Sequence, residues 1–488
     1  MVAPKSVPAG AGKEKAYPVK IGLEVHGYLD TAEKLFCMCK TDSLASDANS
    51  RICPICTGQP GSKPMAVNEE AVRKVVQIAT IFKSEINTEK LIWQRKHYNW
   101  ADNPKGYQTT LSGPHATMNG IGGKFNGINM TELHLEEDPA QWNPETGRVD
   151  YNRSGLPLVE MVTEPEFSDS EQVVEWLKSL VLALSYIGAI RKNAGIKVDV
   201  NVSTYGERVE MKNLNSFEKI RKAINYEIAR QVEVYEGNRG LRTEDRYEQK
   251  RETLAFDEKL GKTIKMRSKE DAADYRFIPD SDLPEIVISK KMLMEVKASI
   301  PEMPAEKLDK LLKKFKVNPK DAKILTKNLE LVEMFEAIAS MGGDKVDTVS
   351  VNKMLPWITV ELLRVLNYNK MTLEDEEVDV RPEHLAELIM AVWSGKITKL
   401  KGKQILNDMI PKSFSLKDHK GEIASIDEAG VENLCRQVID ENAKVVGEYK
   451  GGKDASLNYL IGQVMRLSER RADFRTAGEI LKRLIGRD

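Results

Sequence analysis

Four of the five cysteines in this 488-residue chain lie close together. Cys37 and Cys39 form one pair and Cys53 and Cys56 a second, with thirteen residues between the pairs. Two pairs of thiols across a short loop are typical of a tetrahedral structural zinc site, although the first pair is one residue tighter than usual. The alternative is four thiols without a metal. Because the chain is otherwise poor in cysteine, we expect zinc and a reducing compartment; we expect Cys435 to be an ordinary core residue.

A second group of chemically capable residues lies on strand-like segments. In 20–26, alternation places Ile21, Leu23 and Val25 on one face and Glu24 and His26 on the other. Three further segments alternate in the same way, and their polar positions are mostly acids, amides and histidine: Glu132, His134 and Glu136; Asp199, Asn201 and Ser203; Glu210 and Lys212. Each segment therefore predicts a strand with one apolar and one polar side.

If these strands share a sheet, like charges gather on its polar face and require cations for neutralisation. Oxygen ligands with an occasional imidazole suit Mg²⁺ or Mn²⁺ better than Zn²⁺. Carboxylate-bound divalent ions are what phosphoryl transfer from ATP needs, because that catalysis is mainly positioning and charge neutralisation. The pattern favours a metal–nucleotide site, and solvated sheet faces are the alternative.

Composition limits the classes of protein that this chain can be. Its length predicts two to four domains, and hydrophobic and charged shares of 41% and 30% exclude disorder for most of it. A net charge of −1 means that any nucleic-acid partner must use a local basic patch. No segment reaches the roughly 18 apolar residues of a membrane span, and 1–16 lacks a secretory core, so we expect a soluble cytoplasmic protein with a flexible N-terminal tail over 1–19.

The elements that must position the polar residues are strands with a few helices up to about Ser289, and helices beyond it. Ser168 with Glu171, and Asn215 with Glu218, predict capping boxes at the starts of two amphipathic helices. The end of the chain is locally basic, with ten Lys and Arg against six Asp and Glu from Lys444 onward. This basic surface is either a solvated helix face or a contact for RNA phosphates.

Seven segments in order resemble those of the GatB/GatE family, which includes the GatB chains of tRNA-dependent amidotransferases. They are Ile21-Gly-Leu-Glu-Val-His26, Lys105-Gly-Tyr-Gln108, His134-Leu-Glu-Glu-Asp138, Val149-Asp-Tyr-Asn-Arg-Ser-Gly155, Lys212-Asn-Leu-Asn-Ser-Phe217, Arg267-Ser-Lys-Glu270 with Asp274-Tyr-Arg276, and Leu460-Ile-Gly-Gln-Val-Met465. The resemblance runs from about residue 20 to the end. Family members of the GatE type carry an inserted domain for which this chain has no room, so the GatB type is expected.

The resemblance implies an ATP- and Mg²⁺-dependent carbon–nitrogen ligase that corrects misacylated tRNA. ATP would phosphorylate the side chain of Glu on tRNA(Gln) or Asp on tRNA(Asn), and ammonia would displace the phosphate. The ammonia would come from glutamine through a GatA-like amidase subunit, held with a GatC-like clamp subunit in a heterotrimer. The implied fold is α+β: an antiparallel-sheet cradle with flanking helices over 20–292, an all-α helical domain over 293–412 and a small α-helical YqeY-like tail domain over 413–488 that contacts tRNA.

The resemblance also implies roles for individual residues. Catalytic roles fall on the acids and imidazole Glu24, His26, Glu136, Glu137 and Glu160, of which Glu24, His26, Glu136 and Glu160 would hold magnesium. Binding of ATP, substrate or the tRNA end falls on Lys105, Tyr107, Lys212, Asn213, Arg267, Lys269 and Arg276. Contacts between the tail domain and tRNA fall on Arg466, Arg470 and Arg471. For each basic residue of the cradle, the alternative is an ion pair with a neighbouring acid.

Two other classes of function stay open at this point. The chain could be a non-catalytic tRNA-binding scaffold that keeps the fold and the zinc site. It could also be a free-standing ligase that acts on free glutamate, which a reaction without tRNA would reveal.

Overall fold

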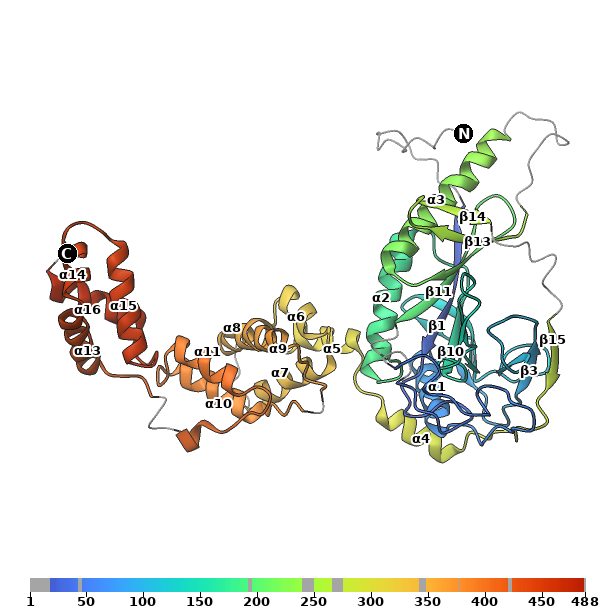
Figure 1. Cartoon of the computed structure of the whole chain (residues 1–488), viewed down its shortest axis with the longest axis horizontal. Helices are drawn as coiled ribbons and strands as arrows, with labels where there is room; N and C mark the ends of the chain where they lie inside the picture. Colours follow the sequence, from blue (N-terminus) through green and yellow to red (C-terminus); the bar gives the residue numbers. More distant parts are fainter. Residues whose placement is uncertain are drawn as a thin grey trace. The chain divides into compact units, whose positions relative to one another are not determined.

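The computed structural model describes residues 18–42, 46–191, 195–238, 250–265, 275–341, 348–375, 377–419 and 424–486. The chain divides into two compact units, 1–301 and 302–488. The first unit combines sheet and helices and the second is helical within its described residues, so the α+β class followed by helices is confirmed (Figure 1). The predicted boundaries of the finer domains stay predictions.

One large sheet forms the centre of the first unit. Among the described residues it contains 13 strands, with the order β14-β13-β12-β11-β1-β10-β7-β4-β3-β15 and with β2, β5 and β6 beside this path. The strands are β1 (Lys20–Tyr28), β2 (Glu85–Ile86), β3 (Gln94–His97), β4 (Tyr107–Thr110), β5 (Gly120–Ile121), β6 (Lys124–Phe125), β7 (Ile128–Glu137), β10 (Pro157–Thr163), β11 (Ile196–Ser203), β12 (Val209–Leu214), β13 (Glu252–Asp257), β14 (Lys262–Lys265) and β15 (Arg276–Pro279). A separate hairpin pairs β8 (Gln141–Trp142) with β9 (Val149–Asp150).

The pairing of these strands is antiparallel except at one place. β12 and β13 run parallel, and the long helix α3 lies between them in sequence. A parallel pair needs such a crossover, whereas the other neighbours run antiparallel. The sheet is therefore antiparallel, as expected, except for this one parallel pair.

Helices cover the apolar face of the sheet. They are α1 (Glu69–Ile81), α2 (Ser170–Tyr186) and α3 (Phe217–Gly237), of which α2 and α3 run side by side in Figure 1, and α4 (Lys290–Ser299) packs against α1. Leu23, Val25, Leu133, Leu135 and Met161 are at most 1% exposed on this face. Burying them is the main stabilising contribution, and it forces the alternate polar residues onto the opposite face.

The two predicted helix starts are each wrong by one residue. The side chain that caps α2 is Asp169, which accepts a hydrogen bond from the Gln172 amide at 2.8 Å, and the side chain that caps α3 is Ser216. Ser168 instead donates its amide to the Gln172 side chain. Asp and Ser are both strong cap residues, so sequence spacing alone does not separate neighbouring candidates.

The position of the α2 cap leads to a stability prediction. Asp169→Ala should lower the free energy of unfolding of the first unit by about 1 kcal/mol, because a helix amide loses its partner. Ser168→Ala is the matched control, since Ser168 makes only exposed side-chain contacts at 3.3 to 3.4 Å, and should cost less than half as much. Urea unfolding measures both, and a larger loss for Ser168→Ala would contradict the assignment.

The second unit is built from short helices. They are α5 (Pro304–Lys313), α6 (Pro319–Leu325), α7 (Leu329–Met341), α8 (Thr348–Pro356), α9 (Leu363–Asn369), α10 (Pro382–Trp393), α11 (Lys399–Asp408), α13 (Glu428–Glu441), α14 (Ala443–Lys450), α15 (Ala455–Leu467) and α16 (Phe474–Ile485), with a 3₁₀ turn at Leu416–His419. A π-helical segment, Trp357–Leu362, follows Pro356. Since proline lacks an amide hydrogen, it disturbs the regular ladder at that point.

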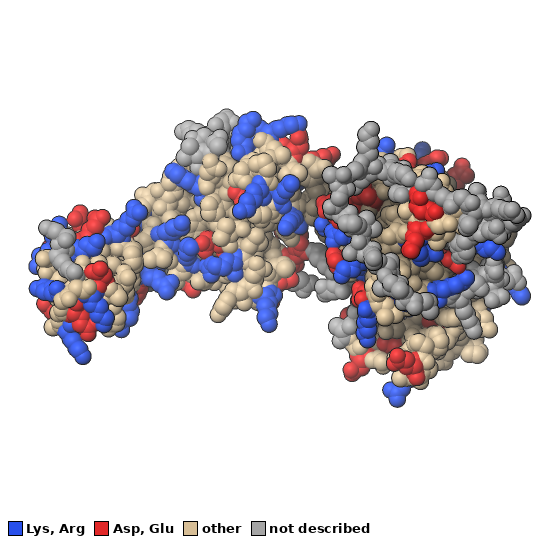
Figure 2. Space-filling view, turned by 90° about the horizontal axis from the view of Figure 1, so that it is seen from above, with Lys and Arg blue, Asp and Glu red and all other residues tan. Residues whose placement is uncertain are grey.

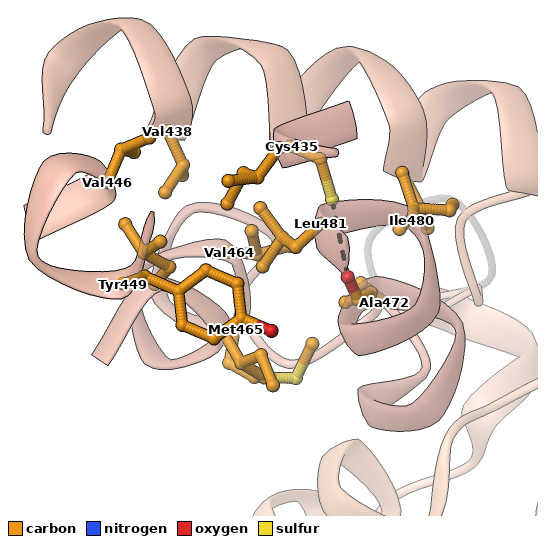
Figure 3. Close-up of a cluster of buried hydrophobic side chains, with 14 residues drawn as sticks. Cys435, Val438, Val446, Tyr449, Val464, Met465, Ala472, Ile480 and Leu481 are labelled. Atoms are coloured by element: carbon orange, nitrogen blue, oxygen red, sulfur yellow. Dashed lines mark hydrogen bonds between the residues drawn. The ribbon is translucent and has the colours of Figure 1, made fainter. Parts of the chain in front are cut away.

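The last four helices enclose their own apolar core. Val438, Leu460, Val464 and Leu481 are fully buried there, and Figure 3 shows Cys435 pointing into the same cluster. Its sulfur lies 3.8 Å from the carbonyl oxygen of Ala477. Cys435 is therefore a buried core thiol, as predicted.

Candidate active site and metal centres

The polar face of five neighbouring strands carries the candidate active site. β1 lies between β10 and β11, so His26 is opposite Glu160 on one side and Glu24 is opposite Asp199 on the other. Glu160 is in turn opposite His134 on β7. We call this surface the acidic face, and its members are Glu24, His26, Glu132, His134, Glu136, Glu160, Asp199 and Glu210.

The first cluster on the acidic face is centred on Glu160. Its Oε2 atom lies 3.1 Å from His26 Nε2 and 3.5 Å from His134 Nε2. His134 Nε2 also lies 3.8 Å from Glu136 Oε2, and its Nδ1 lies 3.4 Å from Glu132 Oε1. His26, Glu136 and Glu160 each offer a ligand atom within 4.8 Å of the other two, which is close enough for one metal ion.

The charges of this cluster depend on one another. Burial favours the neutral imidazole of His26, but the Glu160 carboxylate outweighs it and raises the pKa of His26 to about 9. Burial likewise opposes charge on His134, yet the carboxylates of Glu160, Glu132 and Glu136 raise its pKa well above the ordinary value. Burial would raise the pKa of Glu160, but His134 and His26 hold it well below the usual range. The imidazoles thus supply positive charge between the carboxylates.

A second cluster joins Glu24, Asp199 and Glu210, whose ligand atoms also lie within 4.8 Å of one another. Burial, then Glu160, raises the pKa of Glu24. The ammonium of Lys212 lies 2.8 Å from both Asp199 Oδ2 and Glu210 Oε1. Burial opposes that charge, but the two carboxylates raise the pKa of Lys212 above its ordinary value.

A bulge in β11–β12 orients this second cluster. The register shifts between Val198 and Val200, and Asn213 adopts a positive φ of 59°. Asparagine tolerates that conformation better than most residues. Its amide donates a 2.8 Å hydrogen bond to Asp199 Oδ1, so Asn213 acts here through its backbone.

The predicted binding residues Lys105 and Tyr107 lie beside the acidic face. Lys105 forms an ion pair with Glu137, whose Oε1 also accepts the Thr109 amide at 2.9 Å. The Lys105 ammonium and the Arg95 guanidinium lie 4.9 and 4.6 Å from the Tyr107 ring centroid. Burial raises the pKa of Tyr107 to about 12, which keeps the phenol neutral. Lys105 and Lys212 therefore both adopt the ion-paired alternative.

The other predicted binding residues are not brought to this cluster. Arg276 begins β15 at the end of the sheet order, where it is exposed and opposite His97. Arg267 and Lys269 lie outside the described residues.

A third group of hydrogen-bonded polar side chains lies beside the site, and none of its members has a predicted role. Asp138 Oδ2 accepts the Tyr28 hydroxyl at 2.7 Å and lies 2.9 Å from Arg153 Nε, while Lys197 Nζ donates to Tyr28 Oη at 2.9 Å. Asp138 and Arg153 lie within the family-like segments, so their motifs could have indicated them. Asp199 and Glu210 were recognised as polar strand positions but were not assigned to a metal cluster.

The four clustered cysteines do converge. Their sulfur atoms lie within 4.8 Å of one another, and the Cys53 amide donates to Cys56 Sγ at 3.3 Å. A hydrogen bond from Cys37, with help from the Lys34 ammonium, outweighs burial and lowers the pKa of Cys56 to about 5. The donor set fits a tetrathiolate metal centre.

The three predicted tRNA contacts of the tail lie in or next to the turn that follows α15. Arg466 and Arg470 line one hollow with Gln404, whereas Arg471 directs Nε at the Ser468 carbonyl oxygen, 3.3 Å away. Figure 2 shows Lys and Arg side chains spread over one face of the second unit. In the part of the chain that the structure describes, no helix has the length and apolar character to cross a membrane.

Comparisons with known proteins agree with the two units. Residues 19–294 match the model of the GatB/GatE catalytic domain, and residues 333–485 match that of the GatB domain. A protein of Methanococcus maripaludis strain C5, named as the B-type subunit of an aspartyl/glutamyl-tRNA(Asn/Gln) amidotransferase, is 40% identical over 486 residues, covering 96% of this chain and 98% of the relative. Proteins with the same name from Methanocaldococcus jannaschii and Methanopyrus kandleri are 39% and 38% identical, over 96% of this chain and 98% and 99% of theirs.

Proposed function

This chain belongs to the GatB/GatE family of tRNA-dependent amidotransferase subunits, and from that premise we propose that its acidic face carries the ATP-dependent step of the reaction. In that step a side-chain carboxylate oxygen of Glu or Asp on misacylated tRNA bonds to the terminal phosphorus of ATP, and ADP leaves. Ammonia then bonds to the activated carbonyl carbon, inorganic phosphate leaves, and a proton is lost to give the amide. The observation that carries the proposal is the pair of ligand clusters on adjacent strands.

The donors of the two clusters fit hard divalent cations. Five of the six residues offer carboxylate oxygens and one offers an imidazole, a set that suits Mg²⁺ better than a thiophilic metal. His26, Glu136 and Glu160 would hold one ion, which would replace the proton on the His26 imidazole, and Glu24, Asp199 and Glu210 would hold a second. Bound Mg²⁺ would neutralise phosphate charge as the phosphoryl group moves.

The chain's own cations and hydrogen bonds organise these ligands. His134 contacts both Glu160 and Glu136, so it fixes where the two carboxylates point. Lys212 does the same for Asp199 and Glu210. Lys105, paired with Glu137, can exchange that partner for a phosphate oxygen when ATP binds. These residues pre-organise the site, which reduces the rearrangement needed at the moment of reaction.

The partners follow from the same premise. A glutamine-hydrolysing GatA-like subunit would supply ammonia, since the proposed chemistry on this chain consumes ammonia, and a GatC-like subunit would complete a heterotrimer. The substrate would be Glu-tRNA(Gln), Asp-tRNA(Asn) or both, bound also by Arg466, Arg470 and Arg471 of the tail. Such a reaction belongs where translation occurs, and we propose a cytoplasmic location.

The tetracysteine cluster would hold a structural zinc ion. Cys53→Ser should weaken zinc binding at least 100-fold, because it removes one of four thiolate ligands. Zinc content after dialysis against a mild chelator, measured by atomic emission, reports the loss. Cys435→Ser is the matched control and should keep full zinc content, since Cys435 lies in the core of the second unit. Equal zinc content in the two variants would contradict the assignment.

The test of the proposed function uses the chain purified with its amidase and clamp partners. Mg-ATP and glutamine are supplied with Glu-tRNA(Gln) or, in a parallel reaction, Asp-tRNA(Asn), and formation of the amidated tRNA is followed with and without ATP. ATP-dependent conversion is the expected result. An intact complex that binds both charged tRNAs but converts neither would support the scaffold alternative, and ATP-dependent amide formation on free glutamate without tRNA would support the free-standing ligase.

A further inference from the structure

The tetracysteine loop, described over residues 37–42 and 46–56, lies directly against a second segment, residues 150–156. The hydroxyl of Ser154 donates to the Cys56 carbonyl oxygen at 2.7 Å, and the amide of Arg51 donates to Asn152 Oδ1 at 2.8 Å. The amide of Asn49 donates to Asp150 Oδ1 at 3.0 Å. Asp150, Asn152 and Ser154 are therefore each held by the segment that contains the cysteines.

The buried side chain of Lys34 contacts both segments. It is 1% exposed, and its Nζ lies 3.5 Å from Cys56 Sγ and 3.3 Å from the Tyr151 carbonyl oxygen. A buried ammonium is costly unless an opposite charge lies beside it. Four thiolates around a divalent ion carry net negative charge, so a metal-loaded cluster is a suitable partner for Lys34.

The other end of the 150–156 loop is tied to the active-site strand β7. Arg153 Nε lies 2.9 Å from Asp138 Oδ2, and the amide of Gly155 donates to the Asp138 carbonyl oxygen at 2.9 Å. The amide of Asp138 donates back to the Leu156 carbonyl oxygen at 2.9 Å. Asp138 directly follows Glu136 and Glu137, so a shift of this loop moves the end of β7.

We propose that the tetracysteine centre positions the end of β7, and that Lys34 is the positioning residue that couples metal occupancy to the 150–156 loop. This inference rests on the proposed metal binding by the cysteines and not on the proposed reaction. With metal bound, the negative cluster holds the Lys34 ammonium, and the ammonium holds the Tyr151 carbonyl. Without metal, the cluster carries less negative charge and holds the ammonium less strongly, so the loop with Arg153 and Asp138 loosens.

The experiment compares Lys34→Met with Lys40→Met in the full chain within its complex. Methionine keeps most of the length of lysine but removes the charge, and Lys40 is the matched control because it lies beside Cys39 with its side chain 62% exposed. Cobalt loading reports four-sulfur coordination through the thiolate-to-metal absorption band. Hydrogen exchange of the amides of Asp138, Gly155 and Leu156 reports the loop, and the amides of β1 report global opening.

We expect Lys34→Met to keep the cobalt band while its loop amides exchange at least tenfold faster, as they do in metal-stripped wild type. Lys40→Met should match wild type. The inference is overturned if the two variants exchange alike, or if stripping the metal accelerates β1 by the same factor as the loop. A wild-type chain that binds neither zinc nor cobalt overturns it together with the metal assignment.

A second variant keeps the test decisive if Lys34→Met does not fold. Ser154→Ala removes the hydrogen bond to Cys56 and leaves all four thiols in place. It should likewise keep the cobalt band while the loop amides exchange faster, and unchanged exchange would overturn the coupling. Transamidation measured on the same samples reports separately on the proposed reaction.

Discussion

Replacing Glu136 by Gln should slow tRNA-dependent ATP hydrolysis and amide formation by about 10²- to 10³-fold while tRNA affinity changes less than twofold. Glu136 is one of the three residues whose ligand atoms converge in the first cluster, and it is 5% exposed. The amide keeps the shape of the side chain but removes a negative charge from the proposed ligands of the first ion. The measurements are phosphate release with saturating Glu-tRNA(Gln) and tRNA binding by filter retention.

Glu132→Gln is the matched control for this loss. Glu132 lies on the same strand and also contacts His134, with Oε1 3.4 Å from Nδ1, but it is outside the group of converging ligand atoms. Its substitution changes only how His134 is held, so we expect less than a tenfold loss. Equal losses for both variants would mean that the face acts through its overall charge, and unchanged activity in Glu136→Gln would favour the scaffold alternative.

Asp138→Ala should lower the free energy of unfolding of the first unit by about 3 kcal/mol. The Asp138 side chain is 5% exposed and pairs with Arg153 and with the Tyr28 hydroxyl. Truncation leaves a partly buried guanidinium without its carboxylate, which costs more than losing a neutral hydrogen bond. Urea unfolding followed by hydrogen exchange distinguishes the transition of the first unit from that of the second.

Tyr28→Phe is the comparison for that loss. It removes one neutral donor to Asp138 and leaves the ion pair with Arg153 in place, so about 1 kcal/mol is expected. Helices α13 to α16 should unfold at the same urea concentration in both variants, since their core is separate. A loss of less than 1 kcal/mol in Asp138→Ala would show that solvent already compensates Arg153.

The polar faces of the strands and the convergence of the four cysteines were predictable, because both follow from residue types and spacing within short segments. Alternation along 20–26 and 132–136 distinguishes the buried side chains from the polar ones without knowledge of any partner strand. The helix starts were less predictable, because Asp169 and Ser168 are both good caps and only the observed backbone geometry chooses between them.

The buried polar contacts of α3 were not predictable from its apolar stripe. Apolar residues at helical spacing, Ile220, Ile224, Ile228 and Val232, predict a helix. They do not show which polar side chains of that helix are buried beside them. Glu227 is fully buried, and its Oε1 accepts hydrogen bonds from Arg230 Nη2 at 2.7 Å and from Gln231 Nε2 at 2.8 Å. A helical face that packs on a sheet edge can bury a charge when neighbouring side chains satisfy it, and no local pattern reports those neighbours.

The order and register of the strands determine which acidic side chains contact which histidines. His26 and Glu160 are 134 positions apart, and they touch because β1 and β10 are antiparallel neighbours in one register. Local alternation assigns each residue a face, since the side-chain period of a strand is two residues. The two ligand clusters form only because β12, β11, β1, β10 and β7 pair in this order. Each cluster takes its residues from three neighbouring strands, and burial of their apolar side chains in the core holds these strands side by side.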